Sequence, residues 1–458
     1  MKGKYDLIEG PIASTLMKLT LPIIATNFIS TTYGLVDMIW VGKLGSGSVA
    51  AIGTAIFFVN LAFALFTMVS IGTGVKVAHS IGAGREDQAK VYIHNGLMMS
   101  LLLAFIYMLF ILLTRNHLIG FFDLGRDEIE KVASQFLTIS IIGTIFSFFN
   151  ILLSTVLTSM GNSGKPFLVQ TVGFLVNLIL DPLFIFGLGN FKGLGVSGAA
   201  LATLSANVVV TCLFIGHIKN LALFSKPFMF NVEQMKEVLR MGIPITVQRV
   251  TFTVISIIIA KIIVQWGPNA IAVQRVGIQI ESISYMTIGG LQGAIAAFIG
   301  QNFGAHKQDR IKKGYNNALF ITSIFGVLIS FLFILLPRPI FSLFLSDESS
   351  LSLGSDYMRI IGYSQLFMCL ELMTVGAFNG IGKTYIPPIF SIILTTLRIP
   401  MAIMLSVPFG LNGVWMSIAL SSVLKGIILV FWFKRTFGKM NQMIKGSRLQ
   451  DELKEGTL

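Results

Sequence analysis

Long apolar stretches follow one another along almost the whole chain, separated by short polar segments. Each has about 20 residues or more, the length that a helix needs to cross the hydrocarbon core of a bilayer. The chain shows no series of short alternating segments of the kind that builds a membrane barrel, so helices remain the way to pair the backbone groups. We predict twelve transmembrane helices, at 17–41, 49–75, 92–114, 132–158, 166–188, 195–216, 243–266, 270–300, 315–336, 357–380, 386–407 and 413–433.

The composition agrees with a chain that lies mostly in lipid. Hydrophobic residues make up 54% of it and charged residues 12%, whereas a soluble protein has about 25% charged residues. The two cysteines, Cys212 and Cys369, lie far apart in apolar stretches and predict neither a disulfide framework nor a zinc site. We therefore expect an all-α polytopic membrane protein.

The first and second halves of the chain repeat each other. Four short patterns recur in the same order, at offsets of 222, 222, 221 and 215 residues. They are Pro22 and Pro244, Gly82-Ala83 and Gly304-Ala305, Gly161 and Gly382, and Gly195 and Gly410. Six helices per half is an even number, so both halves enter the membrane from the same side and form a parallel repeat with a pseudo-two-fold axis along the membrane normal.

This repeat predicts the domain organisation. We expect an N-lobe at 1–216, a cytoplasmic linker at 217–238, a C-lobe at 239–435 and a cytoplasmic tail at 436–458. A binding site is expected within or between the lobes, near the middle of the membrane.

The charge of the chain indicates orientation. Its formal net charge is +13, and far more Lys and Arg fall in the loops on the side of the two termini than in the opposite loops. This bias places both termini in the cytoplasm and the protein in the inner or plasma membrane, as a multi-pass protein in contact with lipid. The basic residues do not gather into one patch, so nucleic acid is not expected as a partner.

A few acidic residues lie inside the predicted helices of the first half, where a charge is costly unless it faces protein or water. They are Asp37, with Tyr33 one helical turn before it, and Asp181, with Asn177 on the same face. Thr203 is expected nearby. These oxygen-rich side chains are suited to hold a proton or a hard cation such as sodium. No Lys or Arg lies inside the first six segments away from their ends, which argues against private ion pairs for the two aspartates.

The second half carries intramembrane charges of both signs. Two interpretations stay open at this point: the charges neutralise one another in a buried network, or one of the acids takes part in coupling. The residues are Glu281, Glu371, Arg249, Arg275 and Arg398.

Several stretches resemble multidrug and toxic compound extrusion (MATE) transporters, and the resemblance covers nearly the whole chain. They are "LPIIATNFISTTYGLVDMIWVGKLGSGSVAAIG" in the first segment, "GQNFGAHKQDR" at the end of the eighth, "MGNSGKP" before the fifth, and the half-repeat itself. The resemblance implies two six-helix lobes and export of small amphipathic organic cations, driven by inward flow of protons or sodium. It does not imply an enzyme or a bound cofactor, and we expect a monomer.

The resemblance also implies roles for individual residues. Asp37 and Asp181, with Asn177, Tyr33 and Thr203, fall where the DinF-like branch of the family has its N-lobe cation site, and a sodium ion is expected at Asp37, Asn177 and Asp181 if sodium is the coupling ion. Pro22 falls where this branch bends its first helix. The branch with a C-lobe sodium site carries an acid in segment 7, whereas residues 244–260 here contain none.

Two alternatives to drug export remain. A flippase of the same superfamily would move a lipid-linked or polyanionic substrate and would need basic groups in its cavity, as Arg249, Arg275 and Arg398 would provide. A membrane enzyme would need convergent catalytic groups, yet the five histidines fall at scattered segment ends and loops.

Overall fold

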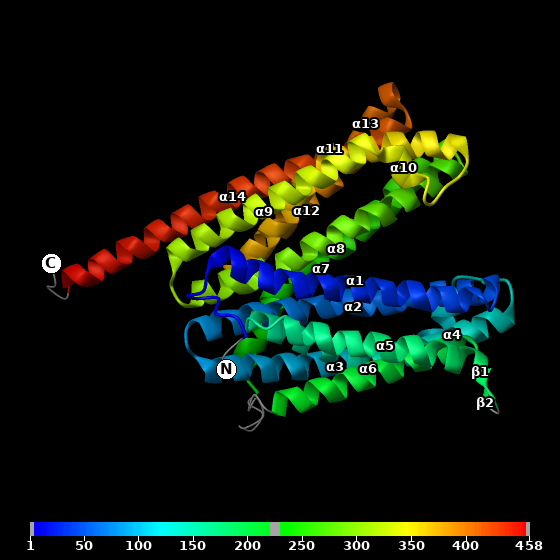
Figure 1. The fold of residues 1–458 in the computed structure, drawn as a ribbon, viewed down its shortest axis with the longest axis horizontal. Coiled ribbons are helices and arrows are strands. Elements are labelled where there is room, and N and C mark those ends of the chain that lie inside the picture. Colours follow the sequence, from blue (N-terminus) through cyan, green and yellow to red (C-terminus); the bar gives the residue numbers. More distant parts are fainter. Residues whose placement is uncertain (1–3, 190, 220–229, 455–458) are drawn as a thin grey trace. The chain divides into compact units, whose positions relative to one another are not determined.

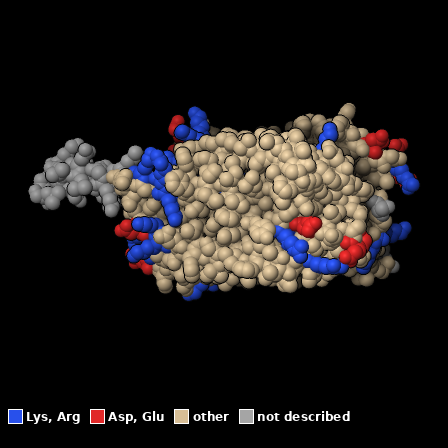
Figure 2. Space-filling model, turned by 90° about the horizontal axis from the view of Figure 1, so that it is seen from above, with Lys and Arg blue, Asp and Glu red and all other residues tan. Residues whose placement is uncertain are grey.

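The computed structural model describes residues 4–189, 191–219 and 230–454, and it consists almost entirely of long helices (Figure 1). Twelve helical segments among the described residues are long and apolar enough to cross a membrane, with Ile386–Phe409 counted as one, which confirms the predicted fold class. Figure 2 shows broad uncharged surfaces along the helices, with Lys, Arg, Asp and Glu gathered mainly toward their ends.

Most of the helices extend beyond the apolar stretches that predict them, because the polar residues at the stretch ends continue the same helices. The chain divides into two compact units, Met1–Thr246 and Val247–Leu458. The helices of the first unit are α1 (Ile12–Gly42), α2 (Ser46–Gly82), α3 (Glu86–Gly120), α4 (Asp127–Ser159), α5 (Gly164–Phe186) and α6 (Val196–Lys219). Helix α7 (Val232–Ile263) begins in the first unit and ends in the second.

The second unit continues with α8 (Pro268–Gly304), α9 (Gln308–Leu335), α11 (Glu348–Gly380), α12 (Ile386–Thr396), α13 (Arg398–Phe409) and α14 (Leu411–Lys454). Two short helical pieces, η1 (Val264–Trp266) and α10 (Pro337–Phe341), lie between them. A small antiparallel hairpin, β1 (Gly187–Leu188) and β2 (Phe191–Lys192), joins α5 to α6 in the first unit.

The two units repeat each other in packing as well as in sequence. In the first, α4 packs against α2, α3 and α6; in the second, α11 packs in the same way against α8, α9 and α14. The turns match too. Gly161 and Gly382 have φ of +85° and +74°, and Gly195 and Gly410 have +57° and +56°, a left-handed backbone that glycine adopts without steric cost.

One predicted helix is interrupted. The segment at 386–407 forms two helices, α12 and α13, with Leu397 between them. Pro400 follows the break, and because proline has no N–H, the carbonyl of Thr396 four residues earlier has no helical donor. Its counterpart α5 is unbroken through the same region.

The predicted domain limits remain a prediction. Ten of the 22 residues of the linker expected at 217–238, residues 220–229, lie outside the described residues. Its last residues, 232–238, are helical and form the start of α7. The expected tail at 436–458 continues the helix α14 as far as Lys454.

Candidate functional site

The five side chains predicted for the first half meet on three neighbouring helices of the first unit. Helix α1 packs against α5, and α5 against α6. The hydroxyl of Thr203 on α6 donates to Asp37 Oδ2 on α1 at 3.4 Å, and Asn177 Nδ2 donates to Asp181 Oδ1 on α5 at 3.1 Å. The two carboxyl groups are close enough to influence each other's charge. The structure therefore brings together residues that are up to 166 positions apart.

This cluster is buried and short of hydrogen-bond donors. Asn177 and Asp181 are fully buried. Asp37 Oδ1, Asn177 Oδ1 and Asp181 Oδ2 accept no hydrogen bond from any described residue, and neither aspartate forms an ion pair with a described Lys or Arg. Two neighbouring carboxyl groups in an apolar surrounding repel each other when both are ionised, unless they share a proton or a cation. The oxygen set suits either.

Tyr33 completes the cluster from one turn before Asp37. Its ring packs against Phe174 of α5 with centroids 6.2 Å apart, and its hydroxyl lies beside Thr203.

A line of polar side chains continues from this cluster along α6, and sequence analysis missed it. Asn207 Nδ2 donates to the Thr203 carbonyl at 3.0 Å. Asn150 on α4 donates to the Asn207 carbonyl at 3.0 Å and accepts from Thr211 at 2.8 Å. The signal was present, because Thr203, Asn207 and Thr211 are spaced four residues apart on one helix face.

Pro22 lies inside α1, which is continuous from Ile12 to Gly42. The Thr26 hydroxyl donates to the Pro22 carbonyl at 2.8 Å. Pro22 itself has no N–H to donate to the carbonyl of Lys18, four residues earlier, so the helix is weakest there. The sequence position predicted for bending is thus a helical turn that lacks one hydrogen bond.

The charged residues of the second half do not all meet. Glu371 on α11 pairs with Lys425 on α14 at 2.9 Å and accepts a hydrogen bond from Ser391 at 3.3 Å. Glu281 on α8 accepts a hydrogen bond from the hydroxyl of Tyr357 on α11. The partners found here, Lys425 and Tyr357, were not predicted as partners of these acids.

The three arginines of this set differ in burial and in their partners. Arg398 on α13 is buried, donates to the hydroxyls of Ser421 and Ser422, and lies over the Phe252 ring at 5.9 Å. Arg249 and Arg275 are exposed and form no ion pair with a described acid. Arg249 and Arg275 therefore do not form ion pairs with the two glutamates.

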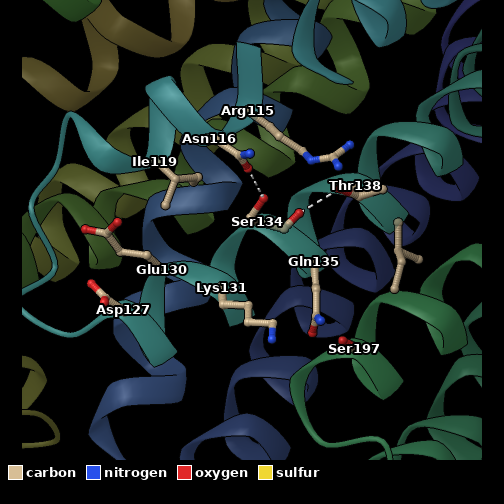
Figure 3. Close-up of a pocket in the computed structure, with 11 residues that line it drawn as sticks. Arg115, Asn116, Ile119, Asp127, Glu130, Lys131, Ser134, Gln135, Thr138 and Ser197 are labelled. Carbon is tan, nitrogen blue, oxygen red and sulfur yellow. Dashed lines mark hydrogen bonds between the residues drawn. The ribbon is translucent and has the colours of Figure 1, made fainter. Parts of the chain in front are cut away.

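A cavity of about 730 Å³ lies elsewhere in the first unit, between the C-terminal end of α3 and the N-terminal end of α4 (Figure 3). It is lined by charges of both signs, Arg115, Lys131, Asp127 and Glu130. Ser134 donates to Asn116 Oδ1 at 3.0 Å across it. It contains none of the clustered site residues. Among the described residues no group of three or more His, Cys, Asp or Glu is placed to hold a metal ion.

Twelve membrane helices in two repeated units, with a buried acidic cluster inside one of them, define a polytopic membrane transporter. The chain belongs to the MatE family: the family model matches residues 22–183 and 244–404, one stretch in each half. The resemblance inferred from the sequence and the internal duplication agree with this match.

Individual relatives align over almost their full length. The chain is 25% identical over 430 residues to a "Probable multidrug resistance protein NorM" of Thermotoga maritima, covering 92% of each chain. It is 26% identical over 461 residues to a "FAD transporter" of Shewanella oneidensis, covering 95% of this chain and 97% of the other. A solved structure, "Crystal structure of MATE in complex with MaD5", is 25% identical with a TM-score of 0.85, covering 96% of this chain and all of the other.

Proposed function

We propose that the protein is a secondary antiporter that exports small amphipathic organic cations from the cell in exchange for protons or sodium ions. Asp37 and Asp181 form the coupling site, with Asn177, Thr203 and Tyr33 around them. The relative of Thermotoga maritima is named a multidrug resistance protein, which supports an organic-cation substrate. The inner or plasma membrane is the location, with both termini in the cytoplasm.

One observation carries the coupling proposal. Three buried oxygens, Asp37 Oδ1, Asn177 Oδ1 and Asp181 Oδ2, lack a hydrogen bond from any described residue, and no described basic residue pairs with the acids. A structural pair of carboxylates would have acquired a basic partner, because unpaired buried charge is strongly unfavourable. Groups that bind and release a cation during transport must instead be free to change their charge.

Exchange follows if the site has different affinities for cation and drug in its two access states. A proton or sodium ion entering from outside neutralises the pair, which lowers the attraction of the N-lobe for a cationic substrate and releases the substrate outward. The turn at Pro22, which already lacks a helical hydrogen bond, gives α1 a place to respond to the charge of Asp37. The two lobes rock around the connection near 217–238 to alternate access.

The experiment measures ethidium transport in everted vesicles with an imposed proton or sodium gradient. We expect Asp37→Asn to abolish gradient-driven transport, since an amide cannot be neutralised by cation binding. Asp123→Asn is the matched control: Asp123 is exposed, lies between α3 and α4 and has φ of +43°, a conformation that asparagine tolerates well. Unchanged transport in Asp37→Asn would contradict the proposal. Collapse by a protonophore identifies the proton as the coupling ion, and collapse on sodium removal identifies sodium.

A further inference from the structure

A second cavity, of about 440 Å³, lies within the second unit. Its walls come from α7, α8, α11, α13 and α14, and its volume falls in the range of small-molecule sites, about 300–1,000 Å³. We call it the C-lobe cavity. Most of the lining is apolar, and the charged or aromatic members used below are Phe252, Arg275, Glu281, Tyr285, Tyr357 and Arg398.

The C-lobe cavity occupies the position that the acidic cluster has in the first unit. With the repeat offsets found in the sequence, 222 for α1 and α7, 221 for α5 and α13, and 215 for α6 and α14, four of its lining residues are the equivalents of site residues. They are Ile255 for Tyr33, Ile259 for Asp37, Arg398 for Asn177 and Ile418 for Thr203. Asp181 corresponds to Ala402, which is fully buried as Asp181 is. The second copy thus has apolar residues at the positions of both acids and an arginine at the position of the amide.

The apolar side of the C-lobe cavity belongs to the core of the second unit. Ile255, Ile259 and Ile263 of α7 are buried in one hydrophobic cluster with Ala402 of α13 and Val414 of α14. The cavity therefore has a packed apolar wall.

Arg398 is the residue of the cavity that most strongly indicates a bound anion. Only 7% of the residue is exposed, yet it forms no ion pair with a described acid. Its hydrogen bonds go to two neutral hydroxyls, those of Ser421 and Ser422. A buried guanidinium without a carboxylate partner keeps a large desolvation cost.

The neighbouring acids Glu371 and Glu281 attract Arg398 from a distance, but neither forms an ion pair with it. Glu371 is held by Lys425 at 2.9 Å, and Glu281 accepts the Tyr357 hydroxyl. Arg275 adds a further positive charge to the cavity wall and has no described ion-pair partner either. With two arginines and one glutamate on its wall, the C-lobe cavity is positively charged overall. Two amide oxygens on its wall, Gln274 Oε1 and Gln365 Oε1, are also buried without a described hydrogen-bond partner.

We infer that the C-lobe cavity binds a small amphipathic anion with an aromatic or aliphatic body and one carboxylate or comparable acidic group. The anionic group is held by Arg398 and Arg275, because guanidinium groups bind carboxylates through paired, charge-assisted hydrogen bonds. The apolar body lies against the Phe252 and Tyr285 rings and the isoleucines of α7. The free amide oxygens accept from any donor on the ligand. This site is separate from the cation site of the first unit and opposite to it in charge.

Isothermal titration calorimetry with 2-naphthoate tests this, on the full chain in phosphatidylcholine nanodiscs without any ion gradient. We expect saturable binding that weakens about tenfold or more in Arg398→Gln and in Arg275→Gln, the cost of losing a charged hydrogen bond. Arg359→Gln is the matched control, because Arg359 lies on α11, is exposed and does not line the cavity. The neutral isostere 2-naphthamide should bind about tenfold more weakly than 2-naphthoate.

Several results would overturn the inference. They are an absence of saturable 2-naphthoate binding, equal affinity for 2-naphthamide, or an equal loss in Arg359→Gln. If phosphatidylglycerol in the nanodiscs competes with 2-naphthoate, the anion is a lipid headgroup and the assignment to a soluble ligand is wrong. Arg275 is exposed, so its variant tests the site even if Arg398→Gln does not fold. Because no gradient is used, the outcome is independent of coupling at Asp37.

Discussion

Lys425 Nζ lies 2.9 Å from Glu371 Oε2, and both side chains are buried between α14 and α11. Removing one member leaves the other charged and unpaired. We expect Glu371→Leu to lower the free energy of unfolding by about 3–5 kcal/mol. Denaturation of the purified protein with increasing detergent fractions measures it.

The double variant Glu371→Leu with Lys425→Met is the informative control. Replacing both members by apolar residues removes the buried charge altogether, so most of the lost stability should return. A double variant as unstable as the sum of both single variants would show that the ion pair itself is required. If Glu371→Leu kept full stability but lost transport, the interpretation of Glu371 as a coupling residue would be favoured instead.

Helix α7 approaches α2 with almost no space at Gly242. A Cβ at this position would lie 2.0 Å from the carbonyl oxygen of Met68, so the two backbones must separate. Gly242→Ala should destabilise the first unit by about 1–3 kcal/mol, the usual cost of overpacking. Gly216→Ala on α6 is the control, because nothing lies within 4 Å of its Cβ position, and it should be neutral or slightly stabilising. Equal melting temperatures for the two variants would refute the close contact.

Much of the fold could be predicted because lipid imposes one rule on every segment. An apolar stretch of sufficient length must be a helix, and the repeated glycines with positive φ, Gly161 and Gly382, end equivalent helices. The break at Leu397 is harder to predict from the sequence, since other prolines lie inside continuous helices: Pro22, Pro182 and Pro244. Whether a proline divides a helix depends on whether neighbouring groups can pair with the backbone carbonyl that it leaves free. The sequence does not show which groups those are.

The number of intramembrane charges explains why the candidate site of the first half could be predicted from the sequence and the charge pairs of the second half could not. Asp37 and Asp181 stand out against a nearly uncharged background, so both could be assigned to one polar set in the first half. In the second half several basic residues could pair with each acid. Glu371 pairs with Lys425, 54 positions away, because of how the helices are rotated, and the composition does not predict that rotation. The sequence did contain a signal for the C-lobe cavity, because the repeat offset of 221 makes Arg398 the equivalent of Asn177.

Both termini are expected on the cytoplasmic side, from the distribution of Lys and Arg. A fluorescent protein that matures only in the cytoplasm, fused after Leu458, should therefore fluoresce in intact cells. The same protein inserted between Leu124 and Gly125, in the connection between α3 and α4, should stay dark. Fluorescence only from the internal insertion would reverse the orientation and, with it, the direction of transport.

The hydrogen bond from Thr203 to Asp37 links α6 to α1 at 3.4 Å and begins the polar line through Asn207. Thr203→Val keeps the shape but removes the hydroxyl, which leaves a buried carboxyl with one donor fewer. A charged hydrogen bond contributes about 1.5–3 kcal/mol, so the affinity for the coupling ion should change by about tenfold or more while the fold persists. Gradient-driven ethidium transport, measured against the concentration of the coupling ion, reports this as a shift of the half-saturation point. Thr54→Val is the control, since Thr54 is half-buried on α2 and its hydroxyl donates to Ala50 within its own helix. If both variants saturate at the wild-type concentration, Thr203 supports packing alone and the coupling site is confined to α1 and α5.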